Sequence, residues 1–290
     1  MASQASMVAI RQARSEDAAE CGRICYDAFK AISDAHGFPC DLPSREVGVG
    51  VITSVFSHPG FYCVVAEAAG RLVGSNCLDE RASIAGVGPI TIDPPWQNRG
   101  TGRRLMQAVL DRARDKGFAG VRLVQAAYHN RSLSLYASLG FDIREPLSCM
   151  QGRTTQRRVP ECPVRVAKPA DLEACNALSR QLHGFERRGD LAEAVERGMA
   201  LVVERGGRIT AYTSALAFFG HATAETNLDL QALIASAESF GGPGILVPTR
   251  NGELFRWCLA NGLRVVQPMT LMSLGLDREP AGAWLPSILF

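Results

Sequence analysis

The clearest pattern of apolar and polar residues lies between residues 102 and 117. Apolar residues recur there at the spacing of one helical face, and charged and polar residues take the opposite face. The apolar set is Leu105, Met106, Val109, Leu110 and Ala113. This period predicts an amphipathic helix that ends at Gly117. Upstream, residues 87–92 are largely apolar with β-branched side chains, which predicts a strand that Pro94 and Pro95 terminate.

The turn that joins this strand to this helix has the properties of an anion site. Gly100 and Gly102 tolerate backbone angles that other residues avoid, and neither has a Cβ that would block a ligand. The first four N–H groups of the helix lack intrahelical partners and lie at the positive end of the helix dipole. A pyrophosphate fits such a turn. Many similar turns bind nothing, however, so the two glycines alone leave both interpretations open.

Two common phosphate-binding loops do not match this turn. A Walker loop has Lys followed by Ser or Thr after its last glycine, whereas Arg103 and Arg104 follow Gly102. The dinucleotide fingerprint G-x-G-x-x-G is also missing from the sequence of the turn. Nucleotide hydrolysis and NAD binding are therefore disfavoured.

Two segments in order match one known family. Residues 97–102, Gln-Asn-Arg-Gly-Thr-Gly, resemble the Gln/Arg-x-x-Gly-x-Gly/Ala loop that binds the acyl-CoA pyrophosphate in the GNAT family of N-acetyltransferases. Residues 130–141 resemble the second signature of that family, an Asn followed by a helix that carries Tyr136 and ends in Gly-Phe. A strand is predicted between them, over residues 121–126. The resemblance covers roughly residues 7–150 and implies a mixed α/β (α+β) sheet fold.

The resemblance implies that acetyl-CoA is the acyl donor and assigns residues to its parts. A splayed strand would pair its backbone with the pantetheine amides. Loop amides would bind the pyrophosphate, and the side chains of Arg99 and Arg103 would add positive charge. Asn130 would bond the pantetheine arm, although an Asn entering a helix is equally an ordinary N-cap. The expected donor-binding residues are Ile90, Thr91, Ile92, Gln97, Asn98, Arg99, Gly100, Thr101, Gly102, Arg103 and Asn130.

Tyr136 is the expected general acid. As an amine attacks the thioester, a positioned phenol can give the departing sulfur a proton, which is typically worth about 10² to 10⁴ in rate. A strand amide, that of Ile92, would meet the charge on the acyl oxygen. The alternative is that Tyr136 is a core tyrosine with a satisfied hydroxyl.

The general base is less well defined by the sequence. The family uses a carboxylate on a central strand or a water molecule to take the proton from the amine. Asp79 and Glu80 close a strand predicted over residues 71–78, and Asp93 follows the splayed strand. Glu80 is the candidate named here, and all three are also compatible with solvated turn positions.

Composition narrows the class of protein. The chain has 290 residues, 47% hydrophobic and 21% charged, with a net charge of +2, so neither nucleic acid nor a membrane is expected as a partner. The N-terminus has no apolar signal core, which favours a cytoplasmic protein. Nine cysteines without paired C-x-x-C spacing are expected to be reduced thiols, and no metal is expected. The oligomeric state is open, and a homodimer is compatible with the sequence.

The second half of the chain repeats the first. Residues 10–21 align with residues 164–175 at a fixed offset, which places Arg11 and Asp17 opposite Arg165 and Asp171. Residues 67–72 match residues 204–209, and residues 133–141 parallel residues 255–263. The repeat predicts two tandem GNAT-like domains: a catalytic domain over 1–150, a linker over 151–162 and a degenerate domain over 163–290.

The second copy lacks the chemistry of the first. No glycine loop precedes its predicted helix over residues 227–240, and Cys258 stands where Tyr136 would be. The second copy is expected either to shape the substrate cleft or only to stabilise the first, and one acetyl-CoA site per chain is expected. The turns within residues 31–62 carry aromatic and histidine side chains that are expected to set acceptor specificity.

The function expected from the sequence is acetyl transfer from acetyl-CoA to a primary amine of a small molecule or peptide, by direct attack on the thioester. The acceptor is undefined. The alternatives are a non-catalytic acyl-CoA sensor and an interaction protein in which neither copy binds acyl-CoA.

Overall fold

The computed structural model describes residues 8–155, called here the first half, and residues 158–289, called the second half. Within these residues the larger of two sheets has the strand order β1-β2-β3-β4-β6-β13-β7-β12, with β5 beside β3. Its strands are β1 (Ala9–Gln12), β2 (Phe61–Ala68), β3 (Arg71–Asp79), β4 (Ala85–Val87), β5 (Thr91–Ile92), β6 (Gly120–Ala126), β7 (Asp142–Gly152), β12 (Ile245–Pro248) and β13 (Leu263–Gly275). Neighbouring strands run antiparallel, but β4 and β6 are parallel.

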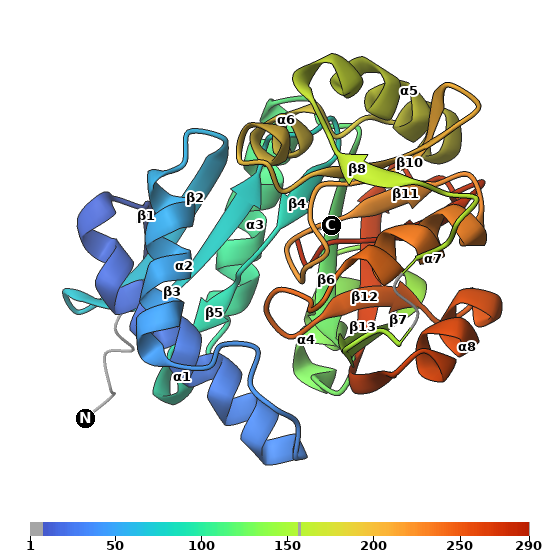
Figure 1. The fold of residues 1–290 in the computed structure, drawn as a ribbon. Coiled ribbons are helices and arrows are strands. Elements are labelled where there is room, and N and C mark those ends of the chain that lie inside the picture. The colour runs from blue at the N-terminus through green and yellow to red at the C-terminus, as the bar shows by residue number, and fades with distance from the viewer. Residues whose placement is uncertain (1–7, 156–157, 290) are drawn as a thin grey trace, which may run out of the picture.

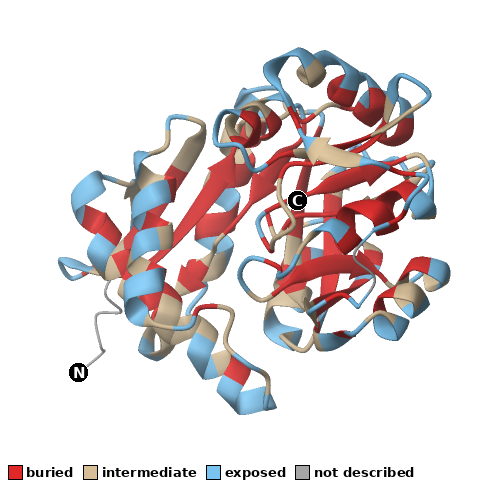
Figure 2. Ribbon diagram, in the orientation of Figure 1, coloured by how far each residue is buried: buried red, intermediate tan, exposed pale blue. Residues whose placement is uncertain are grey.

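The smaller sheet belongs to the second half and has the order β14-β11-β10-β9-β8. Its strands are β8 (Val164–Val166), β9 (Leu201–Arg205), β10 (Arg208–Thr213), β11 (Ala222–Ala224) and β14 (Ala283–Leu285). The second-half helices are α5 (Leu172–His183), α6 (Arg188–Glu196), α7 (Asn227–Ser236) and α8 (Gly252–Ala260). Buried residues concentrate on the strands and on the helix faces turned toward them (Figure 2).

Helices cover both faces of the first-half sheet (Figure 1). The alternation of side chains along β2 separates the two layers: Val64 packs with α3 (Thr101–Asp115), and Val65 packs with α1 (Ala18–His36) and α2 (Arg45–Ser57). The fourth helix of this half is α4 (Asn130–Ser138). All five residues of the predicted apolar stripe on α3 are buried, so the predicted helix is confirmed. None of the described helices is long and apolar enough to cross a membrane.

The prediction of one strand over residues 87–92 is wrong, because the structure has two separate strands in this region. β4 ends at Val87 and β5 begins at Thr91. Pro89 lies in the break and cannot donate a ladder hydrogen bond. β4 pairs with β6 at Ala85 and Gly86, whereas β5 pairs with β3. The chain therefore diverges from β6 after Gly86.

The two halves exchange strands in the larger sheet. β13 of the second half lies between β6 and β7 of the first half, and β7 lies between β13 and β12 (Figure 1). β7 follows α4, and β13 follows α8, the helix that the repeat aligns with α4. Strands of the two copies thus alternate, and neither half closes its own sheet. β7 also runs on to Gly152, which pairs with Leu263.

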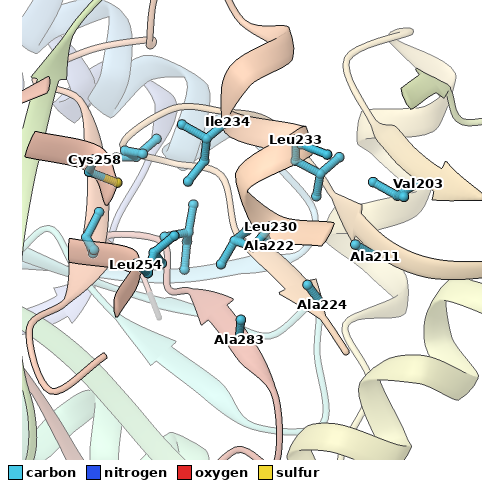
Figure 3. Packing of buried hydrophobic residues seen from close by; sticks show 14 of the residues in the cluster. Val203, Ala211, Ala222, Ala224, Leu230, Leu233, Ile234, Leu254, Cys258 and Ala283 are labelled. Carbon is cyan, nitrogen blue, oxygen red and sulfur yellow. The ribbon is translucent and has the colours of Figure 1, made fainter. Parts of the chain in front are cut away.

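The second half has its own core (Figure 3). Leu230, Leu233 and Ile234 of α7 pack with Leu254 and with strand residues of both sheets. α7 is buried around most of its surface, because it lies between the smaller sheet and α8.

The aligned residues of the repeat make the same contacts in both halves. Arg11 donates to Asp17 at 2.7 Å and to Glu67 at 3.1 Å. Arg165 donates to Asp171 at 2.6 Å and to Glu204 at 2.9 Å. Each aspartate also accepts from a backbone N–H at the start of a short 3₁₀ turn, that of Arg14 in the first half and Lys168 in the second.

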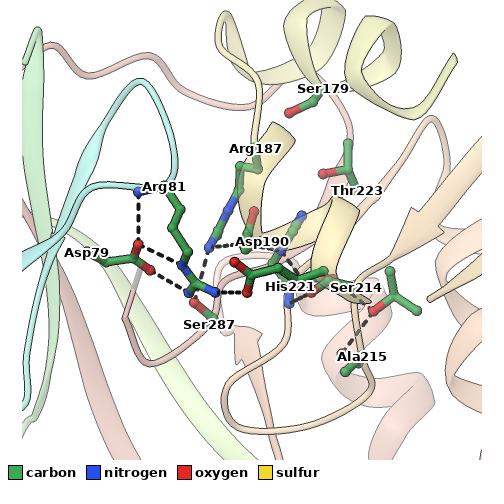
Figure 4. Close-up of polar contacts among 12 residues, drawn as sticks. Asp79, Arg81, Ser179, Arg187, Asp190, Ser214, Ala215, His221, Thr223 and Ser287 are labelled. Carbon is green, nitrogen blue, oxygen red and sulfur yellow. Dashed lines mark hydrogen bonds and ion pairs between the residues drawn. The ribbon is translucent and has the colours of Figure 1, made fainter. Parts of the chain in front are cut away.

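A polar network joins the halves at the end of β3 (Figure 4). Arg81 donates to Asp79 at 2.7 Å and to Glu193 of α6, also at 2.7 Å. Nearby, the largely buried carboxylate of Asp190, 11% exposed, lies 2.6 Å from Arg187 and 3.2 Å from Nδ1 of His221. Burial alone would raise the pKa of Asp190, but Arg187 and His221 hold that pKa below its usual value.

Candidate functional site

One cavity of about 410 Å³ brings together most of the residues predicted to bind the donor. It lies where the chain diverges from β6, and it extends from the start of α3 to α1 and α2. Its walls include the predicted residues Ile90, Thr91, Ile92, Gln97, Asn98, Gly100, Thr101, Gly102, Arg103 and Tyr136. The second half adds five apolar residues to the wall, which are Phe218, Phe219, Met269, Ile288 and Leu289.

The glycine turn lies at one end of the cavity. Gly100 is the N-cap of α3 and has a φ of 81°, and Asn98 has a φ of 62°. Both are left-handed conformations that allow the chain to turn before the helix. A Cβ at Gly102 would lie 3.3 Å from the side chains of Ile92 and Leu135, so a larger residue would crowd this wall.

Arginines surround this end of the cavity. Arg131 of α4 donates to Oδ1 of Asn98 at 3.2 Å and to Oε1 of Gln97 at 3.0 Å, which fixes the turn. Arg103 donates to Ser138 at 2.6 Å. Arg99 is exposed, and its guanidinium lies 5.0 Å from the centre of the Trp96 ring, outside the cavity wall. The helix start and these cations together make an electropositive end that suits a phosphate-bearing ligand.

The backbone of β5 presents an amide toward the divergence from β6. The N–H of Asp93 bonds to the carbonyl of Val73 on β3, at 2.9 Å. Successive residues of a strand direct their amides to opposite sides. The N–H of Ile92 therefore faces away from β3, toward the gap between β5 and β6. Its carbonyl lies on the same side and accepts a hydrogen bond from Gln97 at 3.1 Å.

Three wall residues carry buried polar atoms that have no partner among the described residues. They are Oγ1 of Thr91, Oγ1 of Thr101 and Nε2 of Gln125, on side chains that are 4%, 2% and 6% exposed. A buried polar atom left unpaired costs about 1–3 kcal/mol. A ligand with amide and phosphate groups lying along β5 and α3 would offer them partners, so the wall fits acetyl-CoA.

Tyr136 reaches the cavity from α4. Its ring packs in the same core as α3, with the Phe141 ring 6.2 Å away. Burial raises the pKa of the Tyr136 phenol. The hydroxyl therefore keeps its proton at neutral pH and is available as a donor.

The structure brings none of the three predicted base candidates to the cavity wall. Glu80 accepts hydrogen bonds from Arg112 of α3 at 2.7 and 3.1 Å, and Asp79 is held by Arg81. Asp93 is buried 4.0 Å from Arg23. These three are absent from the lining of the cavity, whose acidic residue is Asp41 instead.

The structure also separates the two interpretations of Asn130. The N-cap of α4 is His129, whose Nδ1 accepts from the N–H of Ser132 at 3.0 Å, so the N-cap interpretation of Asn130 is wrong. Asn130 is exposed and does not line the cavity. Its role toward the donor stays a prediction.

Sequence reasoning missed four polar residues of the site, which are Arg131, Asp41, Gln267 and Gln125. Arg131 was adjacent to a predicted residue, and a basic side chain on the first turn of α4 was the signal that could have identified it. Asp41 lies within the predicted specificity segment, but Gln267, which donates to it, lies 226 positions further along the chain. That contact depends on the strand exchange, which no local pattern in the sequence indicates.

The second copy does not reproduce the site. α7 begins at Asn227 after Thr226, whose hydroxyl accepts from the N–H of Asp229, without a glycine turn. Cys258 is buried in the second-half core.

Comparison with known sequences finds a similarity over the same region. Residues 29–141 match the model of the Acetyltransferase (GNAT) family. The chain is 31% identical over 112 residues to the mycothiol acetyltransferase of Thermobifida fusca, covering 36% of this chain and 34% of that protein. It is 32% identical over 130 residues to the mycothiol acetyltransferase of Nocardia farcinica, covering 43% and 42% respectively. The matches thus span well under half the length of these curated relatives.

Comparison with solved structures extends the likeness to both halves. A protein from Pyrococcus horikoshii, provisionally described as an acetyltransferase, superposes with a TM-score of 0.64 at 19% identity and covers 95% of this chain and 94% of its own. A GCN5-related N-acetyltransferase from Sphaerobacter thermophilus gives a TM-score of 0.62 at 15% identity, with 94% and 96% covered. At these identities the likeness concerns the fold.

Proposed function

Because residues 29–141 match the model of the Acetyltransferase (GNAT) family, we propose that this protein transfers the acetyl group of acetyl-CoA to a primary amine within the cavity at the start of α3. The observation that carries the proposal is that one cavity joins the glycine turn, the unpaired polar atoms of its wall and Tyr136. Acetyl-CoA when bound would supply an activated acetyl thioester.

The residues of the chain bind and orient the donor. The first-turn amides of α3, with Arg103 and Arg131 beside them, hold the pyrophosphate. The hydroxyl of Thr91 and the amide of Gln125, on either side of the divergence, bond the pantetheine arm. This arrangement directs the thioester along β5 toward Tyr136 and the wall formed by α1.

Two groups assist the transfer itself. The N–H of Ile92 faces the gap and donates to the acyl oxygen as negative charge develops on it. The phenol of Tyr136 gives its proton to the sulfur as the C–S bond breaks. Its raised pKa keeps that proton in place before the reaction.

Binding is tested by titrating acetyl-CoA in a calorimeter against wild-type protein, Gly100→Trp and Gly117→Trp. Both glycines have positive φ and open space around the position of a Cβ, so the two substitutions strain the backbone alike. Only Gly100 lines the cavity. We expect one site per chain, a dissociation constant at least about tenfold weaker in Gly100→Trp, and near wild-type binding in Gly117→Trp. Equal affinity in both variants would place the donor elsewhere.

Turnover is tested by thiol release over a panel of primary amines, with Tyr136→Phe and Tyr62→Phe as the matched pair. Tyr62 does not line the cavity, and its ring contacts Arg112 instead. Tyr136→Phe should lower kcat by about 10² to 10⁴ without changing acetyl-CoA affinity, and Tyr62→Phe should stay near wild type. Full activity in Tyr136→Phe would remove the acid assignment. Binding without turnover of any amine would instead support an acyl-CoA sensor.

A further inference from the structure

The cavity wall carries one acidic side chain among the described residues, that of Asp41, on a different segment from the arginines. Arg103 and Arg131 flank the glycine turn, whereas Asp41 lies in the segment between α1 and α2. Its neighbour Leu42 is buried in the core that α1 and α2 share, which anchors the segment. Among the ion pairs of the described residues, none involves Asp41. The wall therefore combines arginines beside the glycine turn with a carboxylate that has no ion-pair partner among the described residues.

Gln267 of the second half orients this carboxylate. Its side-chain Nε2 donates to Oδ1 of Asp41, and its Oε1 accepts from the hydroxyl of Tyr128 at 3.1 Å. Tyr128 is itself held, because its ring stacks on Phe38 with the centroids 4.3 Å apart. Gln267 is 1% exposed and lies at an irregularity in the pairing of β13 with β7. Both polar atoms of the Gln267 side chain are thus held by hydrogen bonds. Gln267 reaches this position because β13 lies between β6 and β7.

The cavity has a largely apolar wall that comes from both halves, with Gln125, Tyr128 and His129 among its polar residues. Phe29 and Ile32 of α1 face it from the first half. Phe218, Phe219 and Met269 face it from the second half, and Phe219 is 50% exposed at this wall. Such walls favour an apolar body, and Asp41 is the one carboxylate among the described lining residues, so a second ammonium group would lack a partner.

We propose that the acceptor is a primary monoamine with an apolar or aromatic body, whose ammonium group is bound by Asp41 at a site that both halves of the chain build. The inference rests on the proposed acetyl transfer, since it names the acceptor for the same cavity. Asp41 contacts the reacting nitrogen, and Gln267 is a positioning residue that holds Asp41.

The protons balance as follows. The acceptor enters as an ammonium ion and gives one proton to the carboxylate of Asp41, which later releases it to solvent. The freed nitrogen lone pair forms the N–C bond, and the C–S bond breaks with the electron pair going to sulfur. Tyr136 gives the sulfur a proton, and the second proton lost by the nitrogen restores the phenol through solvent. The products are the acetamide and the free thiol of CoA.

The ionisation of Asp41 supports this role. Burial raises its pKa to about 6, and the hydrogen bond from Gln267 opposes that rise. The thiols of Cys25, Cys40 and Cys149 and the phenol of Tyr128 interact with it, and burial raises the pKa of each of these four, so none of them titrates near pH 6. His129 also lines the cavity, and burial lowers its pKa below its usual value, so the Asp41→Asn variant decides which group gives the acid limb. The carboxylate is ionised at neutral pH and can accept a proton there.

The test compares three probes that share or vary these features: phenethylamine, phenylalanine and spermidine. Phenylalanine keeps the aromatic body and adds a carboxylate, and spermidine adds further positive charges. We expect kcat/KM for phenethylamine to exceed the other two by about 10² or more, because the carboxylate of phenylalanine would lie beside Asp41 and the further ammonium groups of spermidine find no second carboxylate among the described residues of the wall. Preference for phenylalanine or spermidine, or no reaction with phenethylamine, would overturn the acceptor inference.

The variants Asp41→Asn and Asp34→Asn test the carboxylate with phenethylamine as the probe. Asp34 is an exposed residue of α1 that pairs with Lys30. Asp41→Asn should lower kcat/KM by about 10² to 10⁴ and remove the acid limb near pH 6 from the pH profile, with acetyl-CoA affinity unchanged. Asp34→Asn should keep the wild-type profile. Wild-type turnover by Asp41→Asn would overturn the proposal.

Gln267→Met separates positioning from packing. Loss of the hydrogen bond that lowers the pKa of Asp41 should move the acid limb to higher pH, which a structural role alone would not do. An unmoved limb would remove the role of Gln267. Calorimetry distinguishes failure of the proposed function from failure of this inference. If wild-type protein does not bind acetyl-CoA, the proposed function is wrong. If it binds acetyl-CoA but prefers another amine, or if Asp41→Asn has no effect, only this inference is wrong.

Discussion

At the scale of single residues, one ion-pair cluster occurs twice and makes the internal repeat experimentally accessible. Asp17 is buried, accepts two hydrogen bonds from Arg11 and accepts a third from the backbone of Arg14. The hydrogen bonds from Arg11 lower the pKa of Asp17 in the folded state. Asp171 has the equivalent partners, and Arg165 lowers its pKa in the same way.

This lowered pKa predicts how stability depends on pH. A carboxyl group whose pKa is depressed by folding stabilises the protein above its unfolded pKa, about 3.9 for Asp, and loses that contribution as the pH falls further. Asp17→Asn and Asp171→Asn should each lower the free energy of unfolding by about 1–3 kcal/mol at pH 7. The deficit should shrink below about pH 4, as followed by urea unfolding across pH. A deficit that persists unchanged at low pH would assign it to packing instead.

At the scale of elements, the crossing of α1 and α2 depends on a glycine. A Cβ at Gly22 would lie 2.4 Å from the Cα of Val49 and 2.8 Å from its backbone nitrogen, so the two helices could not keep their present separation. Gly50 of α2 differs, because a Cβ there would meet no atom within 4 Å. The two positions form a matched pair for one substitution.

Alanine at these positions should have opposite effects. Gly22→Ala should destabilise the protein by about 1–3 kcal/mol through overpacking. Gly50→Ala should stabilise it by about 0.5–1 kcal/mol, because alanine loses less backbone entropy in a helix. Thermal unfolding of both variants measures the difference. A Gly22→Ala variant as stable as Gly50→Ala would show that the helices move apart without cost.

Elements with a strong local pattern could be predicted from the sequence. The apolar stripe on α3 repeats at the helical period, so the helix could be predicted without knowledge of its neighbours. The turn before it could be predicted because glycine favours left-handed backbone angles. The break between β4 and β5 was missed because Pro89 lies within an otherwise apolar run. Glu80 was a reasonable base by its place after a strand, but its pairing with Arg112 depends on how α3 packs.

The acceptor end of the cavity could not be predicted for a physical reason. Asp41 and Gln267 meet only because β13 inserts between β6 and β7, and the pairing of strands distant in sequence leaves no signal in either strand alone. The repeat indicates two copies of one fold, but an arrangement in which each copy closes its own sheet satisfies the same alignment. The observed strand order depends on how both halves pack together, which the alignment of the repeat does not specify.

At the scale of the whole molecule, the exchange joins both halves into one hydrophobic and hydrogen-bonded unit. β13 pairs with β6 through residues 269–275 and with β7 through residues 263–273, so removing the second half would expose strand edges on both. Such edges are open to aggregation. Arg81 and Glu193 add an ion pair between the halves, and the carbonyl of Leu289 packs against Gly86 at the divergence.

The two halves should therefore unfold together. Scanning calorimetry should give one transition whose calorimetric and van't Hoff enthalpies agree, although tandem domains commonly unfold in separate steps. Acetyl-CoA should raise the temperature of that whole transition, since a ligand of the folded state stabilises everything that unfolds with its site. Glu193→Gln removes an interhalf charge and leaves the strand pairing intact, so its transition should stay single. Two transitions, with only one shifted by acetyl-CoA, would show that the halves are independent despite the shared sheet.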